Sequence, residues 1–280
     1  LVYSLRHLSR AARRDSDPPR PAHAAFELRR APGPRQPPVG SAAHPHIGRT
    51  DNDTGGYPGG PDDHGFNPAK ISHYHGGDFA GLTARLDYLK DLGITSVWLT
   101  PPLKNKPMQK GTAGYHGYWI TDFTRMDPHL GSNDEFRELV RQAHARGLKV
   151  YMDIIANHTA DVIQYRGGVY DYVTKKAAPY RDASGQPFDE HAVAFNGVNN
   201  PAAFPALSAE KSFAYQPFVP DAEKNIKVPA WLNDVTLYHN RGDSLFVGEN
   251  SIHGAFVGLD DLFTSTDPAE HGRRQHDFYV

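Results

Sequence analysis

Between Leu148 and His158 the chain reads LKVYMDIIANH, and this stretch decides the fold. Its first part, Leu148 to Ile155, is strongly apolar and predicts a strand buried on both faces, as in a parallel α/β sheet. Asp153, Asn157 and His158 then place an acid, an amide and an imidazole at the carboxyl end of that strand. In parallel α/β folds the loops at this end form the ligand-binding face, so we expect the functional site here.

A helix is predicted immediately before this strand. Ser132 and Glu135 form a capping-box pair, and Gly147 stands where a helix should end. Apolar side chains recur between them at helical spacing, at Phe136, Leu139, Val140 and Ala143. The helix therefore leads directly into the strand.

The same arrangement occurs one unit earlier in the chain. Asp78 is placed to cap a helix, Gly93 is placed to end it, and Ile94 to Thr100 reads as a buried strand. One face of this helix carries Phe79, Leu82, Leu86 and Leu89. Two consecutive helix-to-strand units predict a parallel sheet.

Three segments together resemble a known family. They are Gly114-Tyr115-His116-Gly117-Tyr118-Trp119, Asp153 to His158, and Gly258-Leu259-Asp260-Asp261-Leu262-Phe263. In this order they look like landmarks of the alpha-amylase family of glycoside hydrolases, and Trp98 to Pro101 resembles its second barrel strand. The resemblance runs from about Asp51 to about Ala269. It implies an α/β fold, a partial TIM (β/α)8 barrel with a loop-rich domain inserted after the third barrel strand.

This resemblance divides the chain into four parts. Residues 51–157 would form the first part of the barrel, residues 158–257 the inserted domain, and residues 258–280 the return toward the barrel. Residues 1–50 hold nine arginines, eight prolines and no lysine, and we expect them to be disordered. The family's first strand should lie there, but nothing similar is recognisable. A wrong start codon or a frame disruption would explain this, and so would an organelle-type leader, although the segment lacks the apolar core of a secretory signal.

The resemblance also implies where catalytic groups should be. Retaining glycosidases use two carboxyl groups about 5 Å apart. In the family the nucleophilic aspartate follows a Gly-Phe-Arg-x-Asp stretch on the fourth strand, and the acid lies on the fifth; neither is recognisable here. Glu249 resembles the acid motif but precedes Asp261, against the family's order. We therefore expect a chain truncated before the fourth strand and inactive by itself, with no catalytic residue assigned.

Three residues are implied to bind the sugar, and a fourth is implied to support the active site. His158 resembles the family's substrate histidine, whose ring nitrogen donates to a sugar hydroxyl, and Tyr118 resembles its stacking tyrosine. His116 would add a hydrogen bond from the same loop. Asp153 would support the active site, although the family's arginine partner is not recognisable. Core packing is the alternative for Tyr115, Tyr118 and Trp119, and for Trp119 we prefer it. For His158 the alternative is a core histidine with its hydrogen bonds satisfied.

Calcium is the implied cofactor. Asn157 and Asp261 resemble two oxygen ligands of a structural ion that ties the insertion to the barrel, and main-chain carbonyls would supply others. Asp78, with Asp51, Asn52 and Asp53, resembles a second calcium loop found in cyclodextrin-forming members. Asp78 as a simple helix cap is the alternative there.

The net charge and the amino-acid composition limit the classes of partner and of chemistry that we expect. The formal net charge of −2 gives no reason to expect nucleic acid or an anionic membrane, and the absence of cysteine excludes thiol chemistry. An oligo- or polysaccharide substrate is the implied partner, and secretion would suit such an enzyme. Three hypotheses remain at this point: an alpha-amylase-type enzyme on α-1,4-glucans, including transglycosylating members; a noncatalytic carbohydrate-binding remnant; and the product of a damaged gene.

Overall fold

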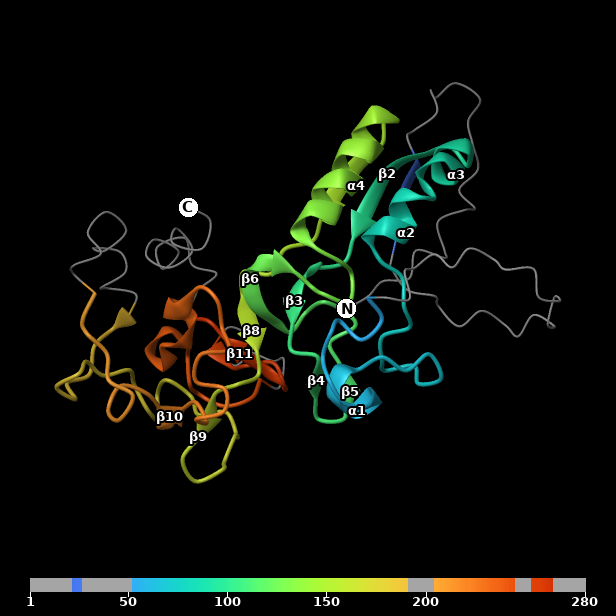
Figure 1. The fold of residues 1–280 in the computed structure, drawn as a ribbon. Coiled ribbons are helices and arrows are strands. Elements are labelled where there is room, and N and C mark those ends of the chain that lie inside the picture. Colours follow the sequence, from blue (N-terminus) through green and yellow to red (C-terminus); the bar gives the residue numbers. More distant parts are fainter. Residues whose placement is uncertain (1–21, 27–51, 191–203, 245–252, 264–280) are drawn as a thin grey trace, which may run out of the picture.

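The computed structural model describes residues 22–26, 52–190, 204–244 and 253–263 (Figure 1). Its helices are α1 (Pro61–His64), α2 (Phe79–Thr83), α3 (Leu86–Asp91) and α4 (Asn133–Ala145), with 3-10 turns η2 (Ala230–Asn233) and η3 (Val235–Leu237). Its strands are β1 (Ala22–Phe26), β2 (Ile94–Leu99), β3 (Leu103–Asn105), β4 (Met108–Gln109), β5 (Thr112–Ala113), β6 (Ile120–Met126), β7 (Lys149–Met152), β8 (His158–Ala160), β9 (Gln164–Tyr165), β10 (Pro217–Phe218) and β11 (Leu259–Asp261). No helix in these ranges is long and apolar enough to cross a membrane.

A parallel sheet in the order β1-β2-β7 forms one half of the described structure. The two predicted strands are neighbours in it, with Val97 paired to Val150 and Leu99 to Met152. The second strand is shorter than expected, ending at Met152, but the N–H of Asp153 still donates to the carbonyl of Leu99 at 3.1 Å. The predicted parallel sheet is therefore confirmed, and Asp153 lies where its last strand ends.

The helix before β7 is confirmed with its caps. Ser132 accepts a hydrogen bond from the N–H of Glu135, whose side chain accepts one from the N–H of Ser132 in return. The helix predicted after Asp78 is instead two short helices, α2 and α3. Asp78 caps α2 as predicted, accepting from the N–H of Gly81 at 2.6 Å. After α2 the N–H of Arg85 donates to the carbonyl of Leu82, three residues earlier instead of four. This tighter turn ends α2, and α3 begins at Leu86.

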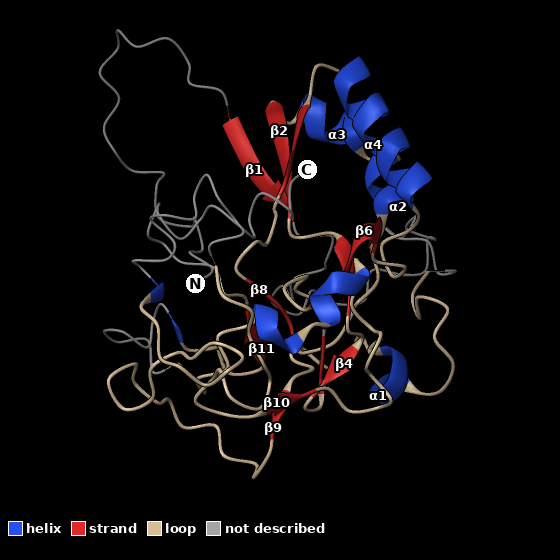
Figure 2. Ribbon diagram, turned by 90° about the vertical axis from the view of Figure 1, so that its left-hand side faces the viewer, coloured by secondary structure: helices blue, strands red, loops and turns tan. Residues whose placement is uncertain are grey.

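Helices α2, α3 and α4 lie on one side of the sheet (Figure 2). They bury a core that contains nearly every residue predicted to face it: Phe79, Leu82, Leu86, Leu89, Val97, Leu99, Leu139, Ala143 and Leu148. The other face is open, and the neighbouring side chains Trp98 and Tyr151 are 54% and 49% exposed. The prediction of burial on both faces is therefore wrong for the described residues, because helices cover only one of them.

The structure also differs from the expectation that residues 1–50 hold no element. Residues 22–26 form β1, which pairs with β2 in parallel. The segment AHAAF has neither alternation nor β-branched residues to reveal it. The rest of the expected disorder lies outside the described residues.

Residues 158–190, 204–244 and 253–263 are dominated by loops, as the sequence indicates. A second apolar core contains Ile163, Tyr165, Leu232, Tyr238 and Leu262. Two short antiparallel pairs, β8 with β11 and β9 with β10, hold it together. In the described ranges the parallel sheet has three strands and is open, so a closed barrel and a separate inserted domain stay predictions.

Candidate functional site

The antiparallel pair β8–β11 joins the two ends of the loop-rich segment at the predicted site. In its register His158 lies opposite Asp261, and Ala160 lies opposite Leu259. The N–H of Leu262 donates to the carbonyl of Asn157 at 2.9 Å. Two predicted landmarks far apart in sequence are thereby brought together at the carboxyl end of β7.

His158 is buried, with 8% of its surface exposed, and neither ring nitrogen has a hydrogen-bond partner among the described residues. Burial lowers the pKa of this imidazole to about 4, although the nearby backbone of Tyr118 acts in the opposite direction. The ring is therefore neutral at pH 7, with one nitrogen able to donate and the other to accept. Two buried polar atoms without partners are costly, and such atoms are suited to a ligand.

The backbone of Tyr118 lies beside this imidazole, and the side chain of Tyr118 reaches Asp153. The hydroxyl of Tyr118 donates to the carboxylate of Asp153 at 3.3 Å, so Asp153 has a partner that the sequence did not suggest. The N–H of Tyr118 donates to Nδ1 of His116 at 3.0 Å, and the two rings stack with centroids 5.8 Å apart. His116 also meets Trp119 edge to face at 4.5 Å. The loop and the strand end thus form one polar and aromatic cluster.

Gly117 gives this loop its shape. Its φ is +86°, and a Cβ atom there would lie 2.1 Å from the carbonyl oxygen of Pro101. Only glycine fits such a close approach at positive φ without strain. The turn is closed by the N–H of Gly117, which donates to the carbonyl of Gly114 at 2.9 Å. Tyr118 is therefore positioned by a backbone conformation that the sequence specifies.

Asn157 and Asp261, the predicted calcium ligands, are in contact. The side-chain amide of Asn157 donates to Oδ1 of Asp261 at 2.8 Å. Burial raises the pKa of Asp261 well above its usual value, and the bond from Asn157 opposes this only in part. The closest histidine nitrogen, Nε2 of His239, lies 3.9 Å from Oδ2 of Asp261. A buried carboxylate in this environment fits a cation, with the Asn157 amide turned to present its oxygen.

Two of the residues predicted for the second calcium loop are in contact. The amide of Asn52 donates to Oδ2 of Asp78 at 3.2 Å, and Asp78 is buried. Oδ1 of Asp53 lies 3.1 Å from where a Cβ on Gly76 would be. Asp51 lies outside the described residues. Over the described ranges no group of three histidine or acidic side chains has metal-binding geometry, so additional ligands at either site would have to be carbonyls or water.

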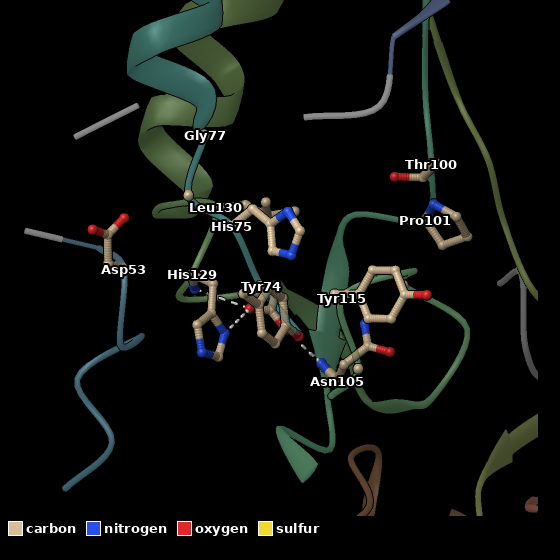
Figure 3. A pocket seen from close by; sticks show the side chains of 14 residues that line it. Asp53, Tyr74, His75, Gly77, Thr100, Pro101, Asn105, Tyr115, His129 and Leu130 are labelled. Carbon is tan, nitrogen blue, oxygen red and sulfur yellow. Dashed lines mark hydrogen bonds and ion pairs between the residues drawn. The ribbon is translucent and has the colours of Figure 1, made fainter. Parts of the chain in front are cut away.

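A pocket is lined by Tyr115 and Gly117 of the same loop, but not by Tyr118, Asp153 or His158 (Figure 3). It is lined by Tyr74, Thr100, Tyr115, Asp127 and His129 among others. Its central polar groups are bonded to one another, because Asp127 accepts from the N–H of Asn105 at 2.9 Å and contacts Nδ1 of His129 at 2.7 Å. His158, whose ring nitrogens have no hydrogen-bond partner within the part of the chain that the structure describes, is therefore a better candidate for the functional site than this pocket.

Sequence reasoning missed Phe256, whose ring lies edge-on to His158 with centroids 6.2 Å apart. No spacing pattern reveals it, because only the pairing of β8 with β11 brings the two residues together.

Sequence reasoning also missed the buried ion pair between Lys227 and Asp260, whose Nζ and Oδ2 atoms are 2.6 Å apart. The sequence around Lys227 and around Asp260 contains no pattern that predicts burial of either side chain.

The chain is similar in sequence to proteins of known family. The model of the alpha amylase catalytic domain matches residues 47–217. An alpha-amylase of Streptomyces lividans is 50% identical over 204 residues, which is 71% of this chain and 22% of that protein. A cyclomaltodextrin glucanotransferase of Klebsiella oxytoca is 40% identical over 125 residues, 40% of this chain and 19% of that one. The chain thus spans about a fifth of the length of these relatives.

Solved structures give a looser match. The gamma-CGTase of Alkalophilic bacillus clarkii is 26% identical, with a TM-score of 0.46 over 77% of this chain and 25% of that one. The alpha-amylase of Geobacillus thermoleovorans, solved in complex with acarbose, is 28% identical, with a TM-score of 0.38 over 70% of this chain and 29% of that one.

Proposed function

This chain belongs to the alpha-amylase family of glycoside hydrolases. We propose that it forms the part of a catalytic domain that binds an α-1,4-linked glucan such as starch or a maltodextrin. The observation that carries this proposal is the cluster of Tyr118, Asp153 and His158 at the carboxyl end of the sheet. Its imidazole is buried and neutral, and its ring nitrogens have no hydrogen-bond partner among the residues that the structure describes, which suits it to a sugar hydroxyl.

Each residue has a separate role in this proposal. The Tyr118 ring packs against the apolar C–H face of a glucose unit, while its hydroxyl is held by Asp153. His158 donates to, or accepts from, a hydroxyl of the same unit, and His116 fixes the loop through the N–H of Tyr118. Both ring nitrogens of His158 are closed to solvent, so a neighbouring side chain has to move as the sugar enters.

The cleavage step of a retaining enzyme needs a nucleophilic carboxylate and an acid about 5 Å apart. None of the described carboxylates is assigned to either role, and Glu249 lies outside the described residues. We propose that the 280-residue chain binds glucan without cleaving it. Its site residues would bind and orient the sugar while the rest of such a catalytic site supplies the two carboxyl groups.

Calcium is proposed between Asn157 and Asp261. The ion would neutralise the buried carboxylate of Asp261 and hold β11 against the start of β8. Its role would be structural, because it would fix His158, the residue after Asn157. A second ion at Asn52, Asp53 and Asp78 is proposed on the weaker ground that two of these side chains are in contact.

Cyclodextrin formation is a second candidate reaction. The similarity to the Klebsiella oxytoca cyclomaltodextrin glucanotransferase supports it, since that relative is named for the transfer of a glucan chain. Both reactions need the same sugar contacts at Tyr118 and His158, so binding experiments test the shared part of the two candidates.

Isothermal titration of the purified chain with maltohexaose tests the proposal. We expect binding, and we expect His158→Ala and Tyr118→Ala each to weaken it at least tenfold. Tyr88→Ala is the matched control, because Tyr88 is 58% exposed on α3. His158→Gln is a second variant that keeps a side chain of similar volume, so that it is less prone to unfold than His158→Ala. Circular dichroism checks that each variant is folded. Absence of binding by the unaltered chain refutes the proposal, and cleavage of soluble starch by it refutes the view that the carboxyl pair is missing.

A further inference from the structure

Phe256 is the aromatic side chain nearest to the proposed sugar contact that the proposal does not yet use. We propose that it is a second stacking residue of the His158 site, which packs on the glucose unit next to the one held by Tyr118. This inference rests on the proposed glucan binding and adds to it a specificity-determining residue supplied by the loop-rich segment.

A tight turn fixes Phe256 relative to His158. The N–H of Leu259 donates to the carbonyl of Phe256 at 2.9 Å, which closes a four-residue turn. Gly258 occupies its third position with a φ of +86°, as a type II turn requires. The chain then enters β11, which pairs with β8 so that Asp261 lies opposite His158. The turn thus folds Phe256 back toward the imidazole.

Gln109 holds this turn from the opposite side. Its side chain is buried at the end of β4, and Nε2 donates to the carbonyl of Gly258 at 2.5 Å. A Cβ atom on Gly258 would lie 3.0 Å from that nitrogen, so glycine is needed both for its φ and for this contact. The β4–β5 hairpin, which precedes the loop of Tyr118, therefore also positions Phe256.

The exposure of Phe256 is what a sugar-contacting ring requires. The ring is 38% exposed, and the adjacent Val257 is 65% exposed, so this turn presents two exposed apolar side chains beginning at the imidazole contact of Phe256. Phe256 and His158 meet at 75° with centroids 6.2 Å apart. Because the nitrogens of His158 are closed to solvent, rotation of the phenyl ring away from the imidazole both opens them and presents its face to the sugar.

Titration with maltohexaose and maltotriose, compared between Phe256→Ala and the unaltered chain, tests this inference. We expect Phe256→Ala to weaken maltohexaose binding about three- to tenfold, the range of one aromatic stacking contact. Phe256→Tyr should restore it, because the ring is kept. Maltotriose, which covers fewer subsites, should lose less. Tyr88→Ala again serves as the aromatic control on α3.

The outcomes separate the inference from the proposed function. Unchanged maltohexaose binding in Phe256→Ala, together with weakened binding in His158→Ala, overturns the inference and leaves the function standing. Tighter binding in Phe256→Ala shows that the ring only covers His158, and this also overturns it. Absence of binding in the unaltered chain refutes the proposed function itself.

Gln109 is a positioning residue in this scheme, and a double-mutant cycle tests it. Gln109→Ala should weaken maltohexaose binding in the unaltered background but have no further effect when Phe256 is already alanine. Equal losses in both backgrounds show a general structural role and contradict positioning of Phe256 by Gln109.

Discussion

At the scale of single residues, two glycines and one tyrosine show how individual positions affect the stability of the fold. Gly111 and Gly117 both have positive φ, +78° and +86°, but only Gly117 is pressed against another backbone atom. The two positions therefore separate the cost of a left-handed conformation from the cost of a collision.

We expect Gly111→Ala to lower the free energy of unfolding by about 1 kcal/mol, the penalty of left-handed geometry. Gly117→Ala should cost about 2 kcal/mol more, because its methyl group would meet the carbonyl of Pro101. Urea denaturation followed by circular dichroism measures both. Equal losses in the two variants would contradict the collision.

Tyr57 makes stability depend on alkaline pH. Burial and the negative charge of Asp127 raise its pKa to about 12, above the ordinary value of 10. Between these values the folded protein keeps the phenol proton while the unfolded chain loses it, so stability is full below pH 10 and falls as pH rises toward 12. Tyr57→Phe should fall less steeply over this window in thermal melts. Parallel curves for both proteins would contradict the assignment.

At the scale of elements, a buried charge network anchors β11. Asp260 accepts from the N–H groups of Val162 and Ile163 and pairs with Lys227, which also reaches the hydroxyl of Tyr238 at 3.1 Å. The ion pair links the strand to a distant loop while every partner is buried.

Removing one charge should be worse than removing both. Lys227→Met leaves a buried carboxylate unpaired and should cost roughly 3–5 kcal/mol, whereas Lys227→Met combined with Asp260→Asn should cost clearly less. Chemical denaturation of the three proteins at pH 7 measures this. A double variant that is as unstable as the sum of the single ones would argue against a coupled pair.

The elements also show what the sequence could and could not predict. Helix α4 and strand β2 were predictable because capping residues and apolar spacing act locally. The break between α2 and α3, the strand β1 and the open face carrying Trp98 and Tyr151 depend on tertiary contacts that spacing does not encode. For the site, the fold brings Tyr118 to Asp153 and Asn157 to Asp261, all residues selected from the sequence, and their roles stay predictions. Phe256 and Gln109 emerge only from the folded chain.

At the scale of the whole molecule, the contact of Asn157 with Asp261 closes a loop of 104 positions. A cation there would favour the folded state in proportion to its binding, because the unfolded chain lacks the site. We expect calcium to raise the thermal midpoint of EDTA-treated protein. Asp261→Asn should abolish the rise, whereas Asp62→Asn, at a carboxylate 82% exposed, should keep it. A rise that persists in Asp261→Asn would place the ion elsewhere.

The same β8–β11 pairing has a consequence for how the protein is made. A ribosome adding about 5–20 residues per second takes roughly 5–20 s to travel from Asn157 to Asp261. During that interval β8 has been synthesised but its partner has not, while the helix-covered sheet before it is already complete enough to collapse. The imidazole of His158 therefore cannot reach its buried position in this pairing before Asp261 has been synthesised, so the speed of translation sets the earliest moment at which the proposed sugar site can form.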